Sequence, residues 1–166
     1  MNSNSLRDLL VEELKDVYHA ENQLLKALPK MAKAAQNEQL EAAFLTHLKQ
    51  TETQVKRLEQ VFKLLGEPVK GKLCHAMKGL IEEGAEAIAD HDASPMRDAQ
   101  LIGAAQRVEH YEIAAYGTMR TFAKDLGEAK VAALLQTTLN EEGDTDKQLT
   151  KIASVVNRAA MQEASA

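Results

Sequence analysis

The chain has 166 residues, a formal net charge of −5 at pH 7 and 45% apolar residues. This length and composition predict one domain, residues 1–166, with a substantial hydrophobic core. With only 8 Gly, 3 Pro and no Trp, the composition favours helix throughout. Basic residues are spread along the chain, which argues against a nucleic-acid partner, and the single cysteine excludes an internal disulfide.

No stretch approaches about 18 uninterrupted apolar residues, so no membrane-spanning segment and no membrane partner are expected. The first residues, MNSNSLRDLLVEEL, have neither the positive region nor the apolar run of a signal peptide. We therefore expect a cytoplasmic protein.

Periodic apolar residues predict five helices, over residues 6–35, 38–65, 74–92, 96–126 and 129–157. Ser5 and Asn37 are the predicted N-caps of the first two helices, and Ser94 followed by Pro95 is the predicted start of the fourth. Pro29 removes a backbone donor inside the first helix, so we expect a kink or an early end there.

The lengths of the connections predict the topology. Short turns separate the first helix from the second and the fourth from the fifth, so each pair is expected to form an antiparallel hairpin. Gly66 is the predicted stop signal of the second helix, and Gly127 that of the fourth. About thirty residues separate the second helix from the fourth, enough to cross the length of a bundle. The chain is therefore predicted to be an all-α, ferritin-like four-helix bundle, with a long crossover that carries an extra short helix.

Acidic, imidazole and amide side chains lie near the midpoints of the four long helices, on the stripes expected to face the core. Burying an unpaired charge costs several kcal/mol, so such residues are least expected there. Measured from the two turns, most of them lie about 21–29 Å along their helices, and the histidine lies at about 17 Å. They therefore meet at mid-bundle, where a pair of metal ions would explain them. The candidate ligands are Glu21, His47, Gln50, Glu109, Glu112, Glu142 and Asp146.

A carboxylate-rich site with one imidazole suits iron or manganese, with two ions per chain. The pattern departs from the usual Glu-x-x-His pairs of di-iron bundles, because the second helix has His47 and Gln50 at this spacing. The inward stripe of that helix also contains Gln54, to which we assign no ligand role. The competing interpretation is a solvated face: an error of about 20° in the helical wheel would expose some candidates. Glu141 and Asp144 form a rival pair that we expect to face solvent.

Other polar side chains near this layer are weaker candidates. His19 and His110 adjoin predicted ligands but point about 100° away from them. Tyr18, Tyr111 and Tyr116 are expected to serve in packing, with hydrogen bonds to the ligands as the alternative.

The chain resembles the bacterial YciE/YciF stress proteins over nearly its whole length, in the segments YHAENQLLKALPKMAKAA, AFLTHLKQTETQVKRLEQVF, LCHAMKGLIEEG, LIGAAQRVEHYEIAAYGT and LLQTTLNEEGDTD. The resemblance implies a rubrerythrin-like bundle with a dinuclear metal centre, and a homodimer. The family motif H-L-x-E-T in the second helix reads HLKQT here, with Gln50 in the acidic position. This departure weakens the case for one of the two metal positions.

Two functions follow from these residues. The first is a metal-binding protein or a di-iron or di-manganese oxidoreductase of stress defence, which reduces peroxide or oxidises Fe(II). The alternative is a helical scaffold or interaction protein with a degenerate metal site, which Gln50 favours.

Overall fold

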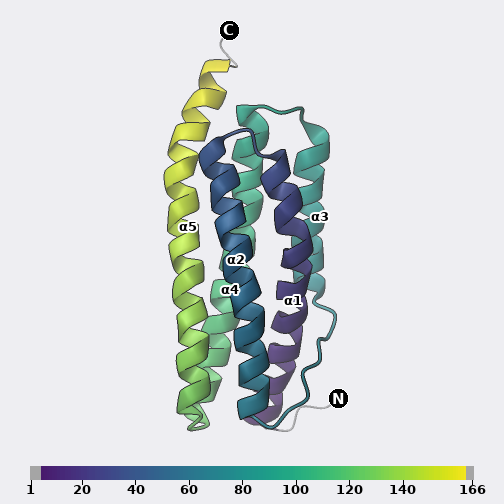
Figure 1. The fold of residues 1–166 in the computed structure, drawn as a ribbon, viewed down its shortest axis with the longest axis vertical. Helices are drawn as coiled ribbons and strands as arrows, with labels where there is room; N and C mark the ends of the chain where they lie inside the picture. Colours follow the sequence, from purple (N-terminus) through teal and green to yellow (C-terminus); the bar gives the residue numbers. More distant parts are fainter. Residues whose placement is uncertain (1–4, 164–166) are drawn as a thin grey trace.

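The computed structural model describes residues 5–163 and is built from helices alone in that range (Figure 1). Residues 1–4 and 164–166 of the predicted domain lie outside the described part. The prediction of an all-α fold is confirmed. The five helices are α1 (Leu6–Ala34), α2 (Glu38–Leu64), α3 (His75–Asp90), α4 (Pro95–Asp125) and α5 (Ala129–Glu163).

The predicted helix ends have the expected capping contacts. The side chains of Ser5, Asn37 and Ser94 each accept a hydrogen bond from the first turn of the helix that follows. Such contacts satisfy backbone donors that have no partner inside the helix. Gly66 and Gly127 follow α2 and α4 with φ of 69° and 76°, the left-handed conformation that glycine adopts without steric cost.

Two helices continue past a residue at which the sequence patterns allow an end. α1 does not end at Pro29, because the next turn is held in the core by the buried residues Met31 and Ala32. α5 passes the predicted end near residue 157, and Ala160 in this extension is also buried. In both places burial against neighbouring helices outweighs the weak local signal.

The helices pack as two antiparallel hairpins, α1 with α2 and α4 with α5 (Figure 1). Contacts of α2 with α5 and of α1 with α4 close the bundle. The segment between α2 and α4 crosses the length of the bundle and carries α3, which packs on α4 and α1. This is the predicted ferritin-like arrangement. None of the described helices is both long and apolar enough to cross a membrane.

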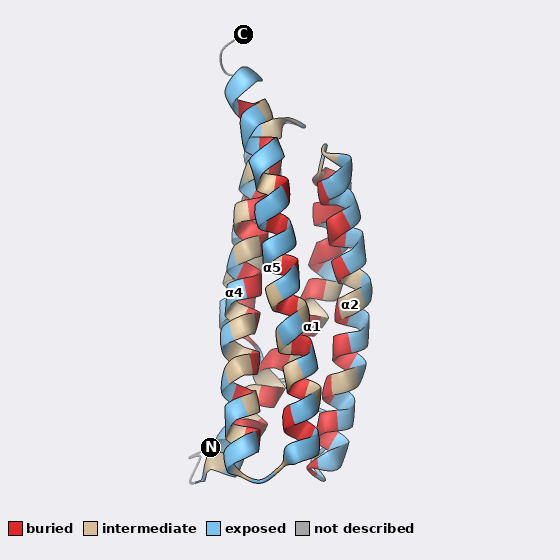
Figure 2. Cartoon of the chain, turned by 90° about the vertical axis from the view of Figure 1, so that its left-hand side faces the viewer, coloured by how far each residue is buried: buried red, intermediate tan, exposed pale blue. Residues whose placement is uncertain are grey.

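Buried side chains line the inner faces of the helices and form two separate apolar clusters (Figure 2). The upper cluster contains Leu24, Phe44, Leu101 and Leu149, and the lower cluster contains Leu14, Phe62, Met119 and Leu135. Along every long helix, the residues between these two clusters include buried polar side chains. The core is therefore interrupted at mid-bundle by a polar layer.

Candidate metal centre

The centre of the polar layer consists of four carboxylates and one imidazole, all removed from solvent. Glu21, Glu112 and Glu142 are fully buried, and Glu109 and His47 are exposed by only 2% and 3%. One ligand atom from each of His47, Glu109, Glu112 and Glu142 lies within 4.8 Å of the other three. α1, α2, α4 and α5 thus each contribute at least one of these buried residues. We call these five residues the carboxylate cluster.

His47 turns one ring nitrogen toward the cluster and the other away from it. Its Nε2 lies 3.2 Å from Glu109 Oε1 and 3.8 Å from Glu142 Oε2, yet it has no hydrogen-bond partner. Its Nδ1 lies 3.4 Å from Gln50 Oε1, a contact that favours the proton on Nδ1. Burial lowers the pKa of His47 to about 4, so the ring is neutral at pH 7 with a free lone pair on Nε2. A neutral imidazole in this orientation is the form that binds a metal.

Glu21 enters the cluster from α1 and is held by a tyrosine on α4. The hydroxyl of Tyr116 donates a hydrogen bond to Glu21 Oε1, while Glu21 Oε2 is buried without a partner. Burial, and then the nearby charge of Glu142, raise the pKa of Glu21 well above its usual value. Glu21 therefore presents one oriented oxygen to the tyrosine and one unused oxygen to the interior.

Buried acids at this density are unfavourable without a positive charge. Burial raises the pKa of Glu109 and Glu112 well above the usual range, and the charge of Glu142 raises both further. The pKa of Glu142 rises to about 7, chiefly through burial. Buried polar atoms nearly always have partners. The buried cluster atoms without a hydrogen-bond partner are Glu21 Oε2, His47 Nε2, Glu109 Oε2, Glu112 Oε1 and Oε2, and Glu142 Oε2.

Those unpartnered atoms fit a metal ion. All of them are carboxylate oxygens or an imidazole nitrogen, which iron and manganese accept as ligands. A cation would offset the repulsion among the acids and occupy the unused lone pairs. The chemistry and placement of these residues therefore agree with a metal site on the bundle axis.

A second group of polar side chains supports one side of the cluster. Gln54 Nε2 donates hydrogen bonds to Glu142 and, at 3.1 Å, to Glu141 Oε2. Arg57 binds both oxygens of Glu141, at 2.9 and 3.0 Å, and donates to Thr138 at 2.6 Å. The guanidinium charge also lowers the pKa of Glu142, although burial acts more strongly in the opposite direction. This group places a fixed cation beside the carboxylates.

The structure does not bring every predicted ligand together. Gln50 is half-buried and contacts His47 on the side away from the carboxylates. Asp146 lies outside the cluster, where it accepts from Gln106 at 3.0 Å and lies 3.3 Å from His110 Nε2. The remaining five predicted ligands form the carboxylate cluster.

The sequence prediction assigns no role to Gln54 and Arg57, which support the cluster from one side. Gln54 follows His47 by two helical turns on the same inward stripe, so its burial was readable from the sequence. Its hydrogen bond to Glu142 was not readable, because α2 and α5 are distant in the chain and their register depends on packing. Nothing in the sequence indicated that Arg57 would lie beside the carboxylates, since an arginine on a helix is usually solvated.

Comparison with known proteins places the chain in a family. A family model described as a domain of unknown function, DUF892, matches residues 5–162. The protein YciF of Escherichia coli (strain K12) is 46% identical over 166 residues, which is 99% of this chain and 100% of that protein. The chain therefore belongs to the DUF892 family, and its predicted resemblance to the YciF-type stress proteins is confirmed.

Solved structures agree with the fold. The crystal structure of the E. coli stress protein YciF superposes with a TM-score of 0.91 at 45% identity, covering 94% of this chain and 99% of that chain. The structure of YcfI from Rhodopseudomonas palustris superposes with a TM-score of 0.87 at 42% identity, covering 90% of this chain and 95% of that one. The ferritin-like helical arrangement is thus shared with both relatives.

Proposed function

We propose that this chain is a dinuclear iron or manganese protein of the bacterial stress response, and that the carboxylate cluster holds the metal. The observation that supports this most strongly is the set of buried oxygen and nitrogen atoms without partners on Glu21, His47, Glu109, Glu112 and Glu142. The stress role is taken from the similarity to YciF, which is described as a stress protein.

Charge balance favours two ions over one. Four ionised carboxylates and a neutral imidazole carry a charge of about −4, which two divalent cations neutralise. A single divalent ion would leave about two negative charges buried, and these would have to be removed by protonation. Glu109, Glu112 and Glu142 are close enough together that their carboxylates would hold such ions jointly.

A pair of iron or manganese ions, when bound, supplies two electrons, the number needed to reduce a peroxide to water or its alcohol. The protein orients the side chains that would bind these ions. Gln50 orients His47, Tyr116 orients Glu21, and Gln54 holds Glu142. The apolar clusters above and below exclude water from the layer, so the charges interact more strongly than they would in solvent.

Metal analysis tests the proposal. Protein purified without chelator and dialysed with Fe(II) or Mn(II) should contain about two ions per chain. Glu109→Ala combined with Glu142→Ala should remove both ions, because it deletes two of the four carboxylates. Elemental analysis and a titration followed by electron paramagnetic resonance would give the stoichiometry and show whether the ions are coupled.

The control variant removes two exposed acids of α3, Glu82→Ala with Glu86→Ala, which changes the net charge equally and leaves the cluster intact. It should retain the metal. If the unmodified chain binds far less than one ion per chain, the metal proposal fails. If it binds only one ion tightly, the proposal of two ions is wrong, but the carboxylate cluster is still a metal site.

The second candidate function is a scaffold protein with a degenerate site. Arg57 and Gln54 favour it, since a guanidinium and an amide already compensate part of the negative charge near Glu142. A chain that carries no metal after loading, and melts at the same temperature with and without Fe(II), would support this alternative.

A further inference from the structure

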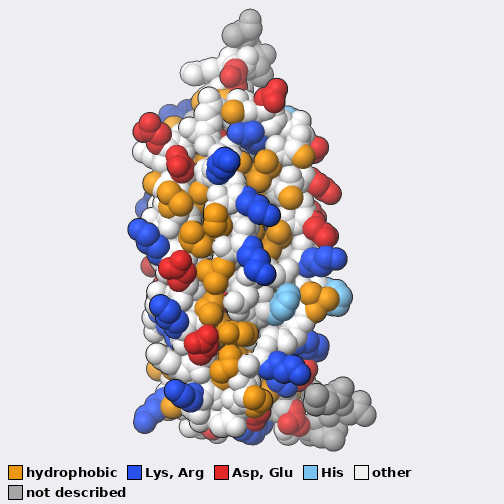
Figure 3. Space-filling view, turned by 45° about the vertical axis from the view of Figure 1, so that its right-hand side comes forward, with side chains coloured by type: hydrophobic (Ala, Val, Ile, Leu, Met, Phe, Trp, Pro, Cys, Tyr) orange, Lys and Arg blue, Asp and Glu red, His pale blue; other side chains and the backbone are white. Residues whose placement is uncertain are grey.

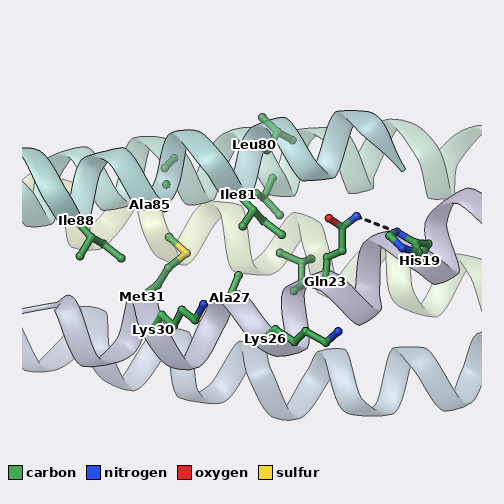
Figure 4. A pocket seen from close by; sticks show the side chains of 14 residues that line it. His19, Gln23, Lys26, Ala27, Lys30, Met31, Leu80, Ile81, Ala85 and Ile88 are labelled. Carbon is green, nitrogen blue, oxygen red and sulfur yellow. Dashed lines mark hydrogen bonds between the residues drawn. The ribbon is translucent and has the colours of Figure 1, made fainter. Parts of the chain in front are cut away.

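An apolar groove of about 390 Å³ lies on the surface between α1 and α3, away from the carboxylate cluster. Ile81 and Ile88 of α3 point across it toward Ala27 and Met31 of α1, as Figure 4 shows. Its floor is completed by aliphatic residues of α1 and α4, including Val108. This volume and apolar lining are typical of a small-ligand site.

The lysine side chains that line the groove both belong to α1. Lys26 and Lys30 both line it, are both exposed, and are four residues apart on α1, so they share a face of that helix. Neither lysine makes an ion pair or a hydrogen bond with any described side chain, and none of the 14 lining residues is acidic. Two unpaired ammonium groups therefore border an apolar floor.

The same face is apolar over a longer distance. Figure 3 shows hydrophobic side chains gathered into a band along the bundle, with lysine, arginine and some acidic side chains among and beside them. The lining residues extend from His19 to Met31 on α1, about 18 Å at the rise of a helix. That length accommodates an extended hydrocarbon chain of roughly a dozen carbons.

We propose that this groove binds an anionic single-chain amphiphile of the fatty-acid class. The hydrocarbon chain lies on the apolar floor between α1 and α3, and the carboxylate is bound by Lys26 and Lys30. Charge complementarity favours an anionic ligand, because two lysine ammonium groups line the groove and no acidic residue does. The site is separate from the carboxylate cluster and does not require bound metal. Any twofold interface of the protein then lies on another face.

Binding of laurate, measured by calorimetry below its micelle concentration, tests the proposal. We expect saturable binding with one laurate per chain. Lys26→Glu with Lys30→Glu should weaken it by about tenfold or more, because each nearby lysine contributes to holding an anionic headgroup. Ala85→Trp places an indole at an exposed position on the rim of the groove and should abolish binding by filling it.

The matched control is Lys49→Glu with Lys56→Glu, which makes the same charge change on exposed positions of α2, outside the groove, and should bind laurate normally. Dodecyltrimethylammonium, which has a similar chain and the opposite charge, should not bind. Thermal melting verifies that each variant is folded. Laurate binding that survives Ala85→Trp, or equal binding of the cationic amphiphile, overturns the proposal. So does light scattering that shows a dimer converted to monomer by Ala85→Trp, since the groove would then be covered by a second copy.

Discussion

The polar layer at mid-bundle and the two apolar clusters around it are buried to the same degree, but burial affects the free energy of folding in opposite directions in the two regions. Leu14 and Leu24, on either side of Glu21 along α1, are as inaccessible as the glutamate between them. Burying each leucine stabilises the fold by about 1.5–3 kcal/mol. Burying Glu21 instead raises its pKa, which means that its charged form opposes folding.

This contrast separates the residues that stabilise the fold from those that we propose bind metal. The apolar clusters contain the residues that hold the hairpins in register, and they need nothing from solution. The charged form of the polar layer opposes folding, so a cation bound there would stabilise the protein. The two regions should therefore respond differently to mutation, metal and pH.

The largest expected effect comes from the lower apolar cluster. Phe62 is fully buried there and packs edge-on against Tyr18, with ring centroids 5.8 Å apart. Phe62→Ala should destabilise the fold by about 3–5 kcal/mol through lost burial and a cavity. Urea denaturation with and without Mn(II) measures this, and the loss should be the same in both. A loss that metal cancels would contradict the separation of the two regions.

An intermediate effect is expected from pH in the metal-free protein. The carboxylate pKa values are raised in the fold, to about 7 for Glu142, so their protonated forms favour folding at low pH, and this contribution is lost as pH rises through the folded values. The pKa of His47 is lowered to about 4, so its contribution is lost in the opposite direction, as pH falls from 6.5 through 4. The four carboxylates with raised pKa values outweigh the one imidazole, so metal-free protein should be more stable at pH 5 than at pH 8 and should melt at lower temperature at pH 8.

Glu112→Gln isolates this effect, because both oxygens of Glu112 are buried without partners. In the metal-free protein the change should stabilise the fold more at pH 8 than at pH 5, because burial and the neighbouring carboxylates raise the pKa of Glu112 and the amide removes the charge that opposes folding at high pH. The same variant should bind metal more weakly. Melting curves at the two pH values provide the measurement. An equal effect at both values would show that Glu112 does not titrate in this range.

Much of this contrast was readable from the sequence because helical periodicity is local. Glu21, His47, Glu109, Glu112 and Glu142 continue apolar stripes, and the antiparallel hairpins place them at similar heights. What the sequence did not supply is the rotation of each helix about its axis, which packing determines. That rotation turns Gln50 and Asp146 away from the centre, and the packing of α2 against α5 places the inward Gln54 beside Glu142.

The smallest expected effect concerns Gln50. Its Oε1 contacts Nδ1 of His47, on the side opposite the carboxylates, so a substitution there acts on the metal only through the imidazole. Gln50→Glu would place a carboxylate against Nδ1–H and make Nε2 a better donor, as in the carboxylate–histidine pairs of many metal sites. We expect metal affinity to rise by about threefold with unchanged stoichiometry, and Gln50→Ala to lower it by about tenfold.

Competition titrations against a metal-binding dye measure both changes in Gln50. Gln60→Glu is the matched control, since it makes the same change at an exposed position of α2 and should leave affinity unchanged. If Gln50→Glu instead raises the number of ions bound per chain, residue 50 contributes a ligand directly, and α2 must rotate toward the centre when metal binds. Unchanged affinity in both Gln50 variants would show that His47 needs no partner on Nδ1, and that the packing of α2 alone orients the ring.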